Sequence, residues 1–175
     1  METINCNQDL IQHTWDSLSL SVVAFAGFPA IAFLLTGDAK YAWFALGIAG
    51  TERISNILKD VLVKINKNEP MLLRPNGAKD CDIMNKNGII QGTPGMPSAH
   101  VSLIVFFFVY AWIASHVTGV SFGVYVAVAS LICALIAASR LQKKCHSYDQ
   151  VFGGASLGAL LAIIWKYLGS VMSVT

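Results

Sequence analysis

Three long segments of this chain are almost wholly apolar, and this feature constrains the fold more than any other. They cover residues 18–36, 120–138 and 151–168. A helix that crosses a bilayer needs about 20 mainly apolar residues, and backbone polar groups inside the bilayer are satisfied only within helices or closed barrels. Charged residues make up 13% of the chain, against roughly 25% in an ordinary soluble domain. We therefore expect an integral, multi-pass membrane protein with a single domain over residues 1–175.

Two further apolar segments bring the expected number of membrane helices to about five. One begins near Ala39, becomes amphipathic after Gly50 and keeps the helical period to Lys64 or beyond. The other covers residues 98–114. The fold class predicted by this pattern is all-α, a polytopic bundle of transmembrane helices. The polar stripe of the amphipathic part, expected to face other helices or water, comprises Arg53, Asn56, Asp60 and Lys67.

Five spans would place three polar clusters on one side of the membrane, because those clusters lie where the second and fourth spans end and the third and fifth begin. The clusters are Lys67 to Arg74-Pro75, then Pro97-Ser98-Ala99-His100, and finally Ser139-Arg140 with His146. If these charged residues were only solvated side chains at loop ends, they would not need to lie on the same side of the membrane. The topology therefore predicts one site with three cations, two histidines and a hydroxyl. The long polar connection 66–97 has a length that is usually functional or disordered.

The residue types in this site favour phosphate binding. Ser98 is a good N-cap, and the free N–H groups of a helix start attract anions; simple capping is the alternative. Arginine offers a planar fork that matches two phosphate oxygens, which favours a role for Arg74, although Lys67 and Arg74 taken alone could be solvated loop charges. Two histidines near one phosphate can divide the work, because one attacks phosphorus while the other protonates the leaving oxygen.

Other classes of function have less support in the sequence. The loops carry neither a dense carboxylate set for magnesium nor a histidine pair at i, i+4 for zinc, so we expect activity without a metal or other cofactor. The net charge is only +2 and the basic residues form no run, which argues against a nucleic-acid partner. The expected partners are the membrane and a lipid phosphate within it. The sequence leaves the oligomeric state open.

Cysteines and buried charges add two smaller expectations. Cys81 and Cys145 fall in loops on the same side, so they can form a disulfide if that side faces an oxidising compartment. Cys133, in an apolar segment, is interpreted as a small core residue. Glu52 and Arg53 fall inside the bilayer, where charged side chains face the protein interior. We expect these two charges to hold helices together; contact with the substrate is the alternative.

The three clusters, in this order and with these spacings, resemble the three signatures of the type 2 phosphatidic acid phosphatase superfamily. That family includes lipid phosphate phosphatases, polyprenyl diphosphate phosphatases and vanadium haloperoxidases, all built on a helical core. The resemblance implies a metal-independent phosphatase in which His146 is the nucleophile, forming a phospho-histidine, and His100 is the general acid. The phosphate-binding residues that the resemblance implies are Lys67, Arg74, Ser98, Ala99 and Arg140.

Two positions depart from the family pattern. Ala99 stands where the family usually has glycine. The family also places an aspartate four residues after the nucleophile, whereas here that position is Gln150 and Asp149 comes one residue earlier. Either Asp149 takes the orienting role through a shifted turn, or Gln150 takes it without a charge.

The pattern His146-x3-Gln150, together with the segment 95–100, looks like the dolichyl diphosphate phosphatase branch. It therefore favours a polyprenyl or dolichyl diphosphate as substrate, with phosphatidate or another lipid phosphate as the alternative. A non-catalytic membrane scaffold derived from the family is the alternative of another class.

The membrane and the side of the site are less constrained. An ER-like endomembrane or the plasma membrane would suit such a protein. The site side carries eight Lys and Arg residues and the other side two, which by the positive-inside rule would place the site in the cytoplasm. Three of the eight are required by the chemistry, and relatives commonly place the site on the lumenal or outer face, so sidedness stays open.

Overall fold

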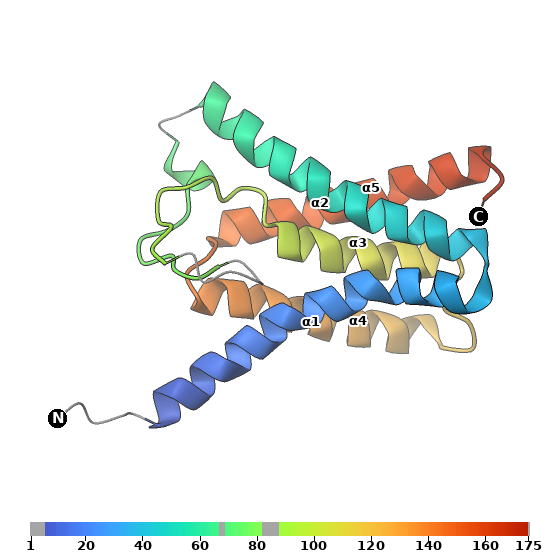
Figure 1. Cartoon of the computed structure of the whole chain (residues 1–175), viewed down its shortest axis with the longest axis horizontal. Helices are drawn as coiled ribbons and strands as arrows, with labels where there is room; N and C mark the ends of the chain where they lie inside the picture. The colour runs from blue at the N-terminus through green and yellow to red at the C-terminus, as the bar shows by residue number, and fades with distance from the viewer. Residues whose placement is uncertain (1–5, 67–68, 82–87, 175) are drawn as a thin grey trace.

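The computed structural model describes residues 6–66, 69–81 and 88–174, which form a bundle of α-helices (Figure 1). Within these described ranges there is no β-strand, only two isolated bridges, and the predicted all-α class is confirmed. The elements in chain order are α1 (Cys6–Thr36), α2 (Ala39–Ile65), the short 3-10 helix η1 (Pro70–Leu72), α3 (Ala99–Ile113), α4 (Phe122–Gln142) and α5 (Tyr148–Val171).

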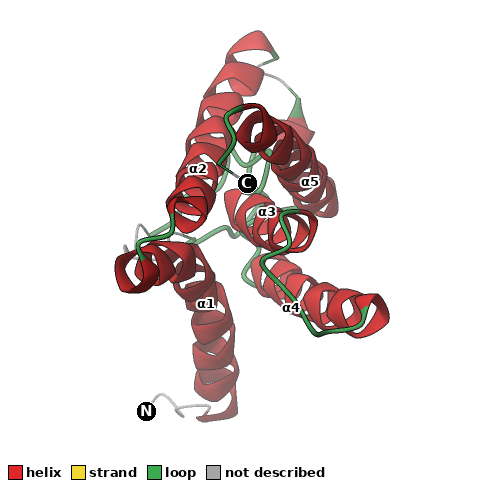
Figure 2. Cartoon of the chain, turned by 90° about the vertical axis from the view of Figure 1, so that its right-hand side faces the viewer, coloured by secondary structure: helices red, strands yellow, loops and turns green. Residues whose placement is uncertain are grey.

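Helix α3 lies at the centre of the bundle, with α1, α2, α4 and α5 around it (Figure 2). Its fifteen residues include no Asp, Glu, Lys or Arg, and a helix that is apolar on all sides is expected to be buried. Ile104, Phe106 and Tyr110 have no exposed surface. The ring of Phe44 on α2 lies 4.7 Å from that of Tyr110, centroid to centroid. The core is therefore built around α3.

Three helices are long and apolar enough to cross a membrane, namely α1 over His13–Thr36, α4 over Phe122–Gln142 and α5 over Tyr148–Val171. Their outward faces carry large apolar side chains; Leu34 and Leu35, for example, are 80% and 81% exposed. Such exposure is costly in water and favourable in lipid. The protein is thus an integral membrane protein. All five predicted helices are present. Among the described residues α3 is an apolar helix too short to count as a span, and α2 is not among the three helices that qualify by length and composition.

Helix α2 buries Phe44 and Ile48 in its first half and the small polar residues Thr51 and Ser55 in its second half, where several large apolar side chains face away from the bundle. Thr51 and Ser55 are buried, at 1% and 0% exposure, whereas Ile57 and Ile65 are 60% and 78% exposed. Apolar side chains gain little by leaving lipid for a protein interior, so membrane helices meet through small residues. The amphipathic pattern therefore predicts the helix correctly, but most of its apolar residues are exposed.

The expectation that Glu52 and Arg53 face the interior is wrong, because both side chains are exposed. They lie on the outward side of α2, as do Asn56 and Asp60 of the predicted polar stripe.

The helix ends that carry the polar clusters gather at one end of the bundle, on the left in Figure 1. At the opposite end the chain reverses between α1 and α2 at Gly37, whose φ of 69° favours glycine. The connection between α2 and α3 folds back on itself at the site end, where bridges pair Leu73 with Pro94 and Lys79 with Ile89. The gathering predicted from the topology is confirmed.

Helices α3 and α5 approach closely through glycines of α5, as the small residues of 153–162 predict. A Cβ atom added at Gly154 would lie 2.6 Å from the carbonyl oxygen of Ser98, and one added at Gly158 would overlap the carbonyl oxygen of Ser102. Both contacts are with backbone, which cannot move aside without shifting the helix. The close approach therefore fixes the start of α3 relative to the start of α5.

Replacing Gly158 by alanine should force α3 and α5 apart and lower stability by about 1–3 kcal/mol. The matched control is Gly123→Ala on α4, where no atom would lie within 4 Å of the new Cβ. Thermal unfolding in detergent should show a lower Tm for Gly158→Ala and an unchanged or higher Tm for Gly123→Ala. Equal Tm values for the two variants would contradict this account of the α3–α5 contact.

Candidate active site

The site is assembled from the start of α3, the end of α4, the turn before α5 and the connection between α2 and α3. These elements supply His100, Arg140, His146 and Arg74 respectively. The positive charges of both arginines act on both histidines, so all four side chains lie within electrostatic reach of one another. The structure thus brings together predicted site residues that are up to 72 positions apart in the chain.

Arg140 is buried, with 1% of its surface exposed. Its Nη1 donates to Oγ of Ser19 on α1 at 3.3 Å, and its Nη2 donates to the backbone carbonyl of Cys81 at 2.6 Å. Ser19 Oγ also lies 3.3 Å from Oγ of Ser139. These contacts hold the guanidinium in place from two sides, and a buried cation held in this way is a strong attractor for an anion.

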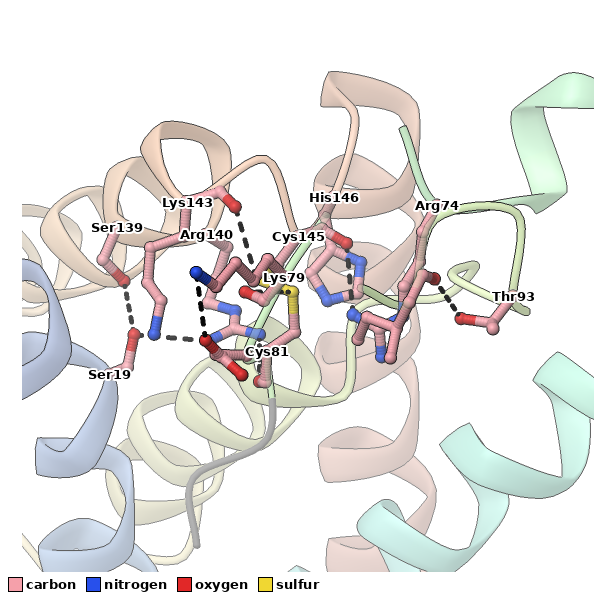
Figure 3. The surroundings of a disulfide bond; sticks show 12 residues. Ser19, Arg74, Lys79, Cys81, Thr93, Ser139, Arg140, Lys143, Cys145 and His146 are labelled. Carbon is pink, nitrogen blue, oxygen red and sulfur yellow. Dashed lines mark hydrogen bonds and ion pairs between the residues drawn. A yellow bond between two sulfur atoms is a disulfide. The ribbon is translucent and has the colours of Figure 1, made fainter. Parts of the chain in front are cut away.

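Arg74 is held through its backbone as well as its side chain. Its amide donates to the carbonyl of Thr93 at 2.8 Å, and its own carbonyl accepts from the amide of Gly92 at 3.2 Å. Its Nη1 donates to the carbonyl of Cys145 at 3.2 Å. Figure 3 shows Arg74 and Arg140 approaching His146 and Cys145 from opposite sides.

A disulfide joins Cys81 to Cys145, as the sequence allowed (Figure 3). It links the α2–α3 connection to the residue immediately before His146. Because the carbonyls of these same two cysteines accept hydrogen bonds from Arg140 and Arg74, the bridge holds both arginine partners in one place. Cys133, in α4, is a free thiol.

Gln150, in the first turn of α5, is hydrogen-bonded to the ring of His146. The Nε2 of Gln150 donates to the carbonyls of Met71 at 2.9 Å and Leu73 at 2.7 Å, which fixes the direction of its amide. The amide oxygen lies 3.1 Å from Nδ1 of His146. An amide oxygen can only accept, so we assign the imidazole proton to Nδ1, which leaves Nε2 with its lone pair.

Burial lowers the pKa of His146 well below its usual value, and the charges of Arg140 and Arg74 lower it further. The hydrogen bond to Gln150 acts in the opposite direction. The imidazole is therefore neutral near pH 7. Asp149, the other candidate for the orienting role, has an exposed side chain.

The start of α3 holds two buried polar atoms that lack a hydrogen-bond partner among the described residues, Oγ of Ser98 and Nε2 of His100. Ser98 occupies the N-cap position, yet its side chain does not cap the helix. Its backbone amide, which the family resemblance assigns to phosphate, instead donates to the carbonyl of Gln150 at 3.0 Å. Ala99 follows as the first helical residue and is 9% exposed. Unsatisfied buried groups of this kind indicate a place for a ligand.

Sequence reasoning missed several contributors to the site. Lys67 lies outside the described residues, whereas the charge of Lys59 on α2 acts on both His100 and His146. Ser19 is one of three serines at alternate positions in the apolar α1 segment, and no spacing distinguishes it. The carbonyls of Met71, Leu73, Cys81 and Cys145 belong to the backbone, so residue type gives no signal for them.

The fold and the site define a class of protein, a membrane-embedded helical bundle with two histidines and two arginines gathered at one end. Residues 40–171 match the PAP2 superfamily, and the chain belongs to that superfamily.

Two relatives bear on this family assignment. Over 141 residues the chain is 28% identical to lipid phosphate phosphatase epsilon 1, chloroplastic, of Arabidopsis thaliana, covering 75% of this chain and 42% of that protein. The chain therefore spans less than half the length of this curated relative. It also resembles the crystal structure of the first transmembrane PAP2 type phosphatidylglycerolphosphate phosphatase from Bacillus subtilis. That likeness has a TM-score of 0.51 and 18% identity over 96% of this chain and 88% of the other, and it supports the fold.

Proposed function

We propose that this protein is a membrane phosphatase that hydrolyses a lipid phosphate or diphosphate through a phospho-histidine on His146. The observation that carries this proposal is the state of His146, a buried imidazole whose Nδ1 is held by Gln150 and whose pKa is lowered by burial and by two arginines. A neutral imidazole with one nitrogen fixed presents the other as a nucleophile. The arginines supply the charge that a phosphoryl group requires.

The reaction divides into two displacements at phosphorus. Nε2 of His146 attacks phosphorus and forms a P–N bond while the P–O bond to the lipid breaks. The negative charge of the bound phosphate would favour the protonated form of His100, which takes up a proton as the substrate binds and gives it to the leaving oxygen. Water then attacks the phospho-histidine and passes a proton to His100, which releases inorganic phosphate and restores both histidines. Arg74 and Arg140 would stabilise the equatorial oxygens in both steps, and Ser98 Oγ would donate to one of them.

The substrate would carry its phosphate at the level of the lipid headgroups. We favour a polyprenyl or dolichyl diphosphate, because the pattern Gly95-Met96-Pro97-Ser98-x-His100 with Gln150 after His146 resembles that branch of the family. The names of the two relatives, a lipid phosphate phosphatase and a phosphatidylglycerolphosphate phosphatase, support a lipid monophosphate as the alternative. Each of these lipids presents the same phosphoryl chemistry to the site.

A non-catalytic membrane scaffold is the competing class of function. Such a protein would need neither a neutral buried histidine nor a side chain that fixes its tautomer. The contacts of Gln150 with His146 and with two backbone carbonyls therefore favour an enzyme.

The first prediction concerns the nucleophile. Detergent-purified protein should release phosphate from a polyprenyl diphosphate and, more slowly, from phosphatidate, and EDTA should leave both rates unchanged because the site works through histidines and arginines. His146→Ala should lower the rate below a few per cent of wild type, since it removes the proposed nucleophile. Residual turnover above that level would remove His146 as the nucleophile, and equal behaviour of variant and wild type with every lipid would favour the scaffold.

The second prediction separates Gln150 from Asp149. Gln150→Ala should lower kcat by roughly 10²-fold to 10⁴-fold, because His146 loses the acceptor that fixes its tautomer. Asp149→Ala alters an exposed side chain and should stay within about twofold of wild type. Gln150→Glu keeps an acceptor but places a carboxylate against the carbonyls of Met71 and Leu73, so it should also lower the Tm. A larger loss of kcat in Asp149→Ala than in Gln150→Ala would reverse the assignment.

We infer that the site faces an oxidising compartment, because the Cys81–Cys145 disulfide lies on the site side of the bundle and disulfides persist in such compartments. The excess of Lys and Arg on that side would by itself favour the cytoplasm. Arg74 and Arg140, and Lys67 by family resemblance, belong to the phosphate site, which weakens the charge argument.

Thiol labelling in sealed vesicles of known orientation tests this orientation. In a background with Cys6→Ser and Cys133→Ser, an impermeant maleimide should label Cys81 and Cys145 only after reduction, and only from the side opposite the cytoplasm. Labelling from the cytoplasmic side without reductant would contradict both the bridge and the orientation.

A further inference from the structure

The bundle-facing side of α2 consists of small polar and apolar residues that recur at helical spacing. Phe44, Ile48, Thr51 and Ser55 are all buried, at steps of four, three and four residues. The hydroxyls of Thr51 and Ser55 donate to the carbonyls four residues earlier, both at 2.8 Å. These hydroxyls therefore need no hydrogen-bond acceptor on the neighbouring helices. One further turn along this face, four residues after Ser55, is Lys59.

Lys59 is half-buried, in contrast to its charged neighbours Arg53, Asp60 and Lys64, which are exposed. Its Nζ donates to Oδ1 of Asn56 at 3.0 Å. Lys59 lies one helical turn after the buried Ser55 and is half-buried, which places the base of its side chain on the bundle-facing side of α2. Its positive charge acts on both His100 and His146. To contact a ligand in the site, its ammonium group would leave Asn56, which lies on the outward side of the helix.

The position of Lys59 within the helix matters for what it can do. Helix α2 continues six residues beyond it to Ile65, so its backbone is held by complete helical hydrogen bonding. A lysine side chain there is a flexible stem on a rigid base, and its ammonium group can reach a ligand as a point charge. Lys67, the lysine that matches the family signature, comes after the end of α2 and lies outside the described residues.

We propose that Lys59 binds the phosphate of the substrate and joins Arg74, Arg140 and the expected Lys67 as a phosphate-binding cation of the site. This inference rests on the proposed phosphatase function. Lys59 would approach the phosphoryl group from α2, Arg140 from α4 and Arg74 from the α2–α3 connection, so that cations from three elements surround it. Its ammonium group would donate hydrogen bonds to a phosphate oxygen and transfer no proton.

Lys59→Met tests the proposal, because methionine keeps much of the apolar stem and removes the charge. We expect kcat/KM for the lipid phosphate to fall by about 10²-fold, as when one donor to a developing charge is removed, and the inhibition constant of inorganic phosphate to rise. Lys59→Arg should recover part of both losses. The matched control is Lys64→Met, which removes an exposed lysine from the last turn of the same helix and should stay within about twofold of wild type.

The dependence of kcat/KM on pH distinguishes a charge of Lys59 that acts on the site from a purely structural role of this residue. His146 attacks only when neutral, so activity is lost as the pH falls through its pKa. The charges of Arg140 from α4, Arg74 from the connection and Lys59 from α2 all lower that pKa. The same three charges act on His100 of α3. Removing Lys59 should therefore raise the pKa and move the acid limb of kcat/KM to higher pH, whereas Lys64→Met should leave it in place.

The outcomes separate this inference from the function on which it rests. If Lys59→Met keeps wild-type kcat/KM, phosphate inhibition and acid limb while His146→Ala is inactive, Lys59 is not a phosphate ligand and the phosphatase stands. If His146→Ala is as active as wild type, the proposed function itself fails. A Tm for Lys59→Met close to that of Lys64→Met would show that any loss of activity is local.

Discussion

The side chain of Gln150 is the interaction on which the geometry of the site depends. Its amide oxygen accepts from His146, and its amide nitrogen donates to the carbonyls of Met71 and Leu73. Its backbone carbonyl accepts from the amide of Ser98. One residue in the first turn of α5 therefore joins the turn that carries His146, the connection that carries Arg74 and the start of α3. A carboxylate could accept from His146 but could not donate to the two carbonyls, so the neutral amide suits this arrangement better than the aspartate of the family pattern.

Close packing in the bundle makes this network possible. Gly154 and Gly158 let α5 approach the backbone of α3 at Ser98 and Ser102, and Gly95 leaves room for the amide of Gln150, whose oxygen would lie 2.6 Å from a Cβ at that position. In the second half of α2, large apolar side chains such as Ile57 and Ile65 face outward, and the small polar residues Thr51 and Ser55 are buried against the bundle. Lys59 follows one helical turn after Ser55 and is half-buried.

Much of this arrangement could be predicted from the sequence. The lengths of the apolar segments predict the helices, and the order of the polar clusters predicts that Arg74, His100, Arg140 and His146 meet at one end. The face of α2 could not be predicted in the same way, because an amphipathic pattern does not say whether its apolar side meets protein or lipid. The hydrogen bond of His146 with Gln150 depends on the turn at Ser147, whose side chain and Gln150 cap α5 reciprocally. Hydrogen bonds to backbone carbonyls, such as that of Arg140 with Cys81, cannot be predicted from residue types, because every residue has a backbone carbonyl.

The central claim is that His146 attacks phosphorus through Nε2 while Gln150 holds Nδ1. The most direct measurement is rapid mixing of the protein with a lipid phosphate, an alkaline quench that preserves phospho-histidine, and mass spectrometry with ³¹P NMR of the modified peptide. The account predicts phosphate on His146, attached at Nε2. Phosphate on His100, attachment at Nδ1 of His146, or turnover without any phospho-histidine would contradict it.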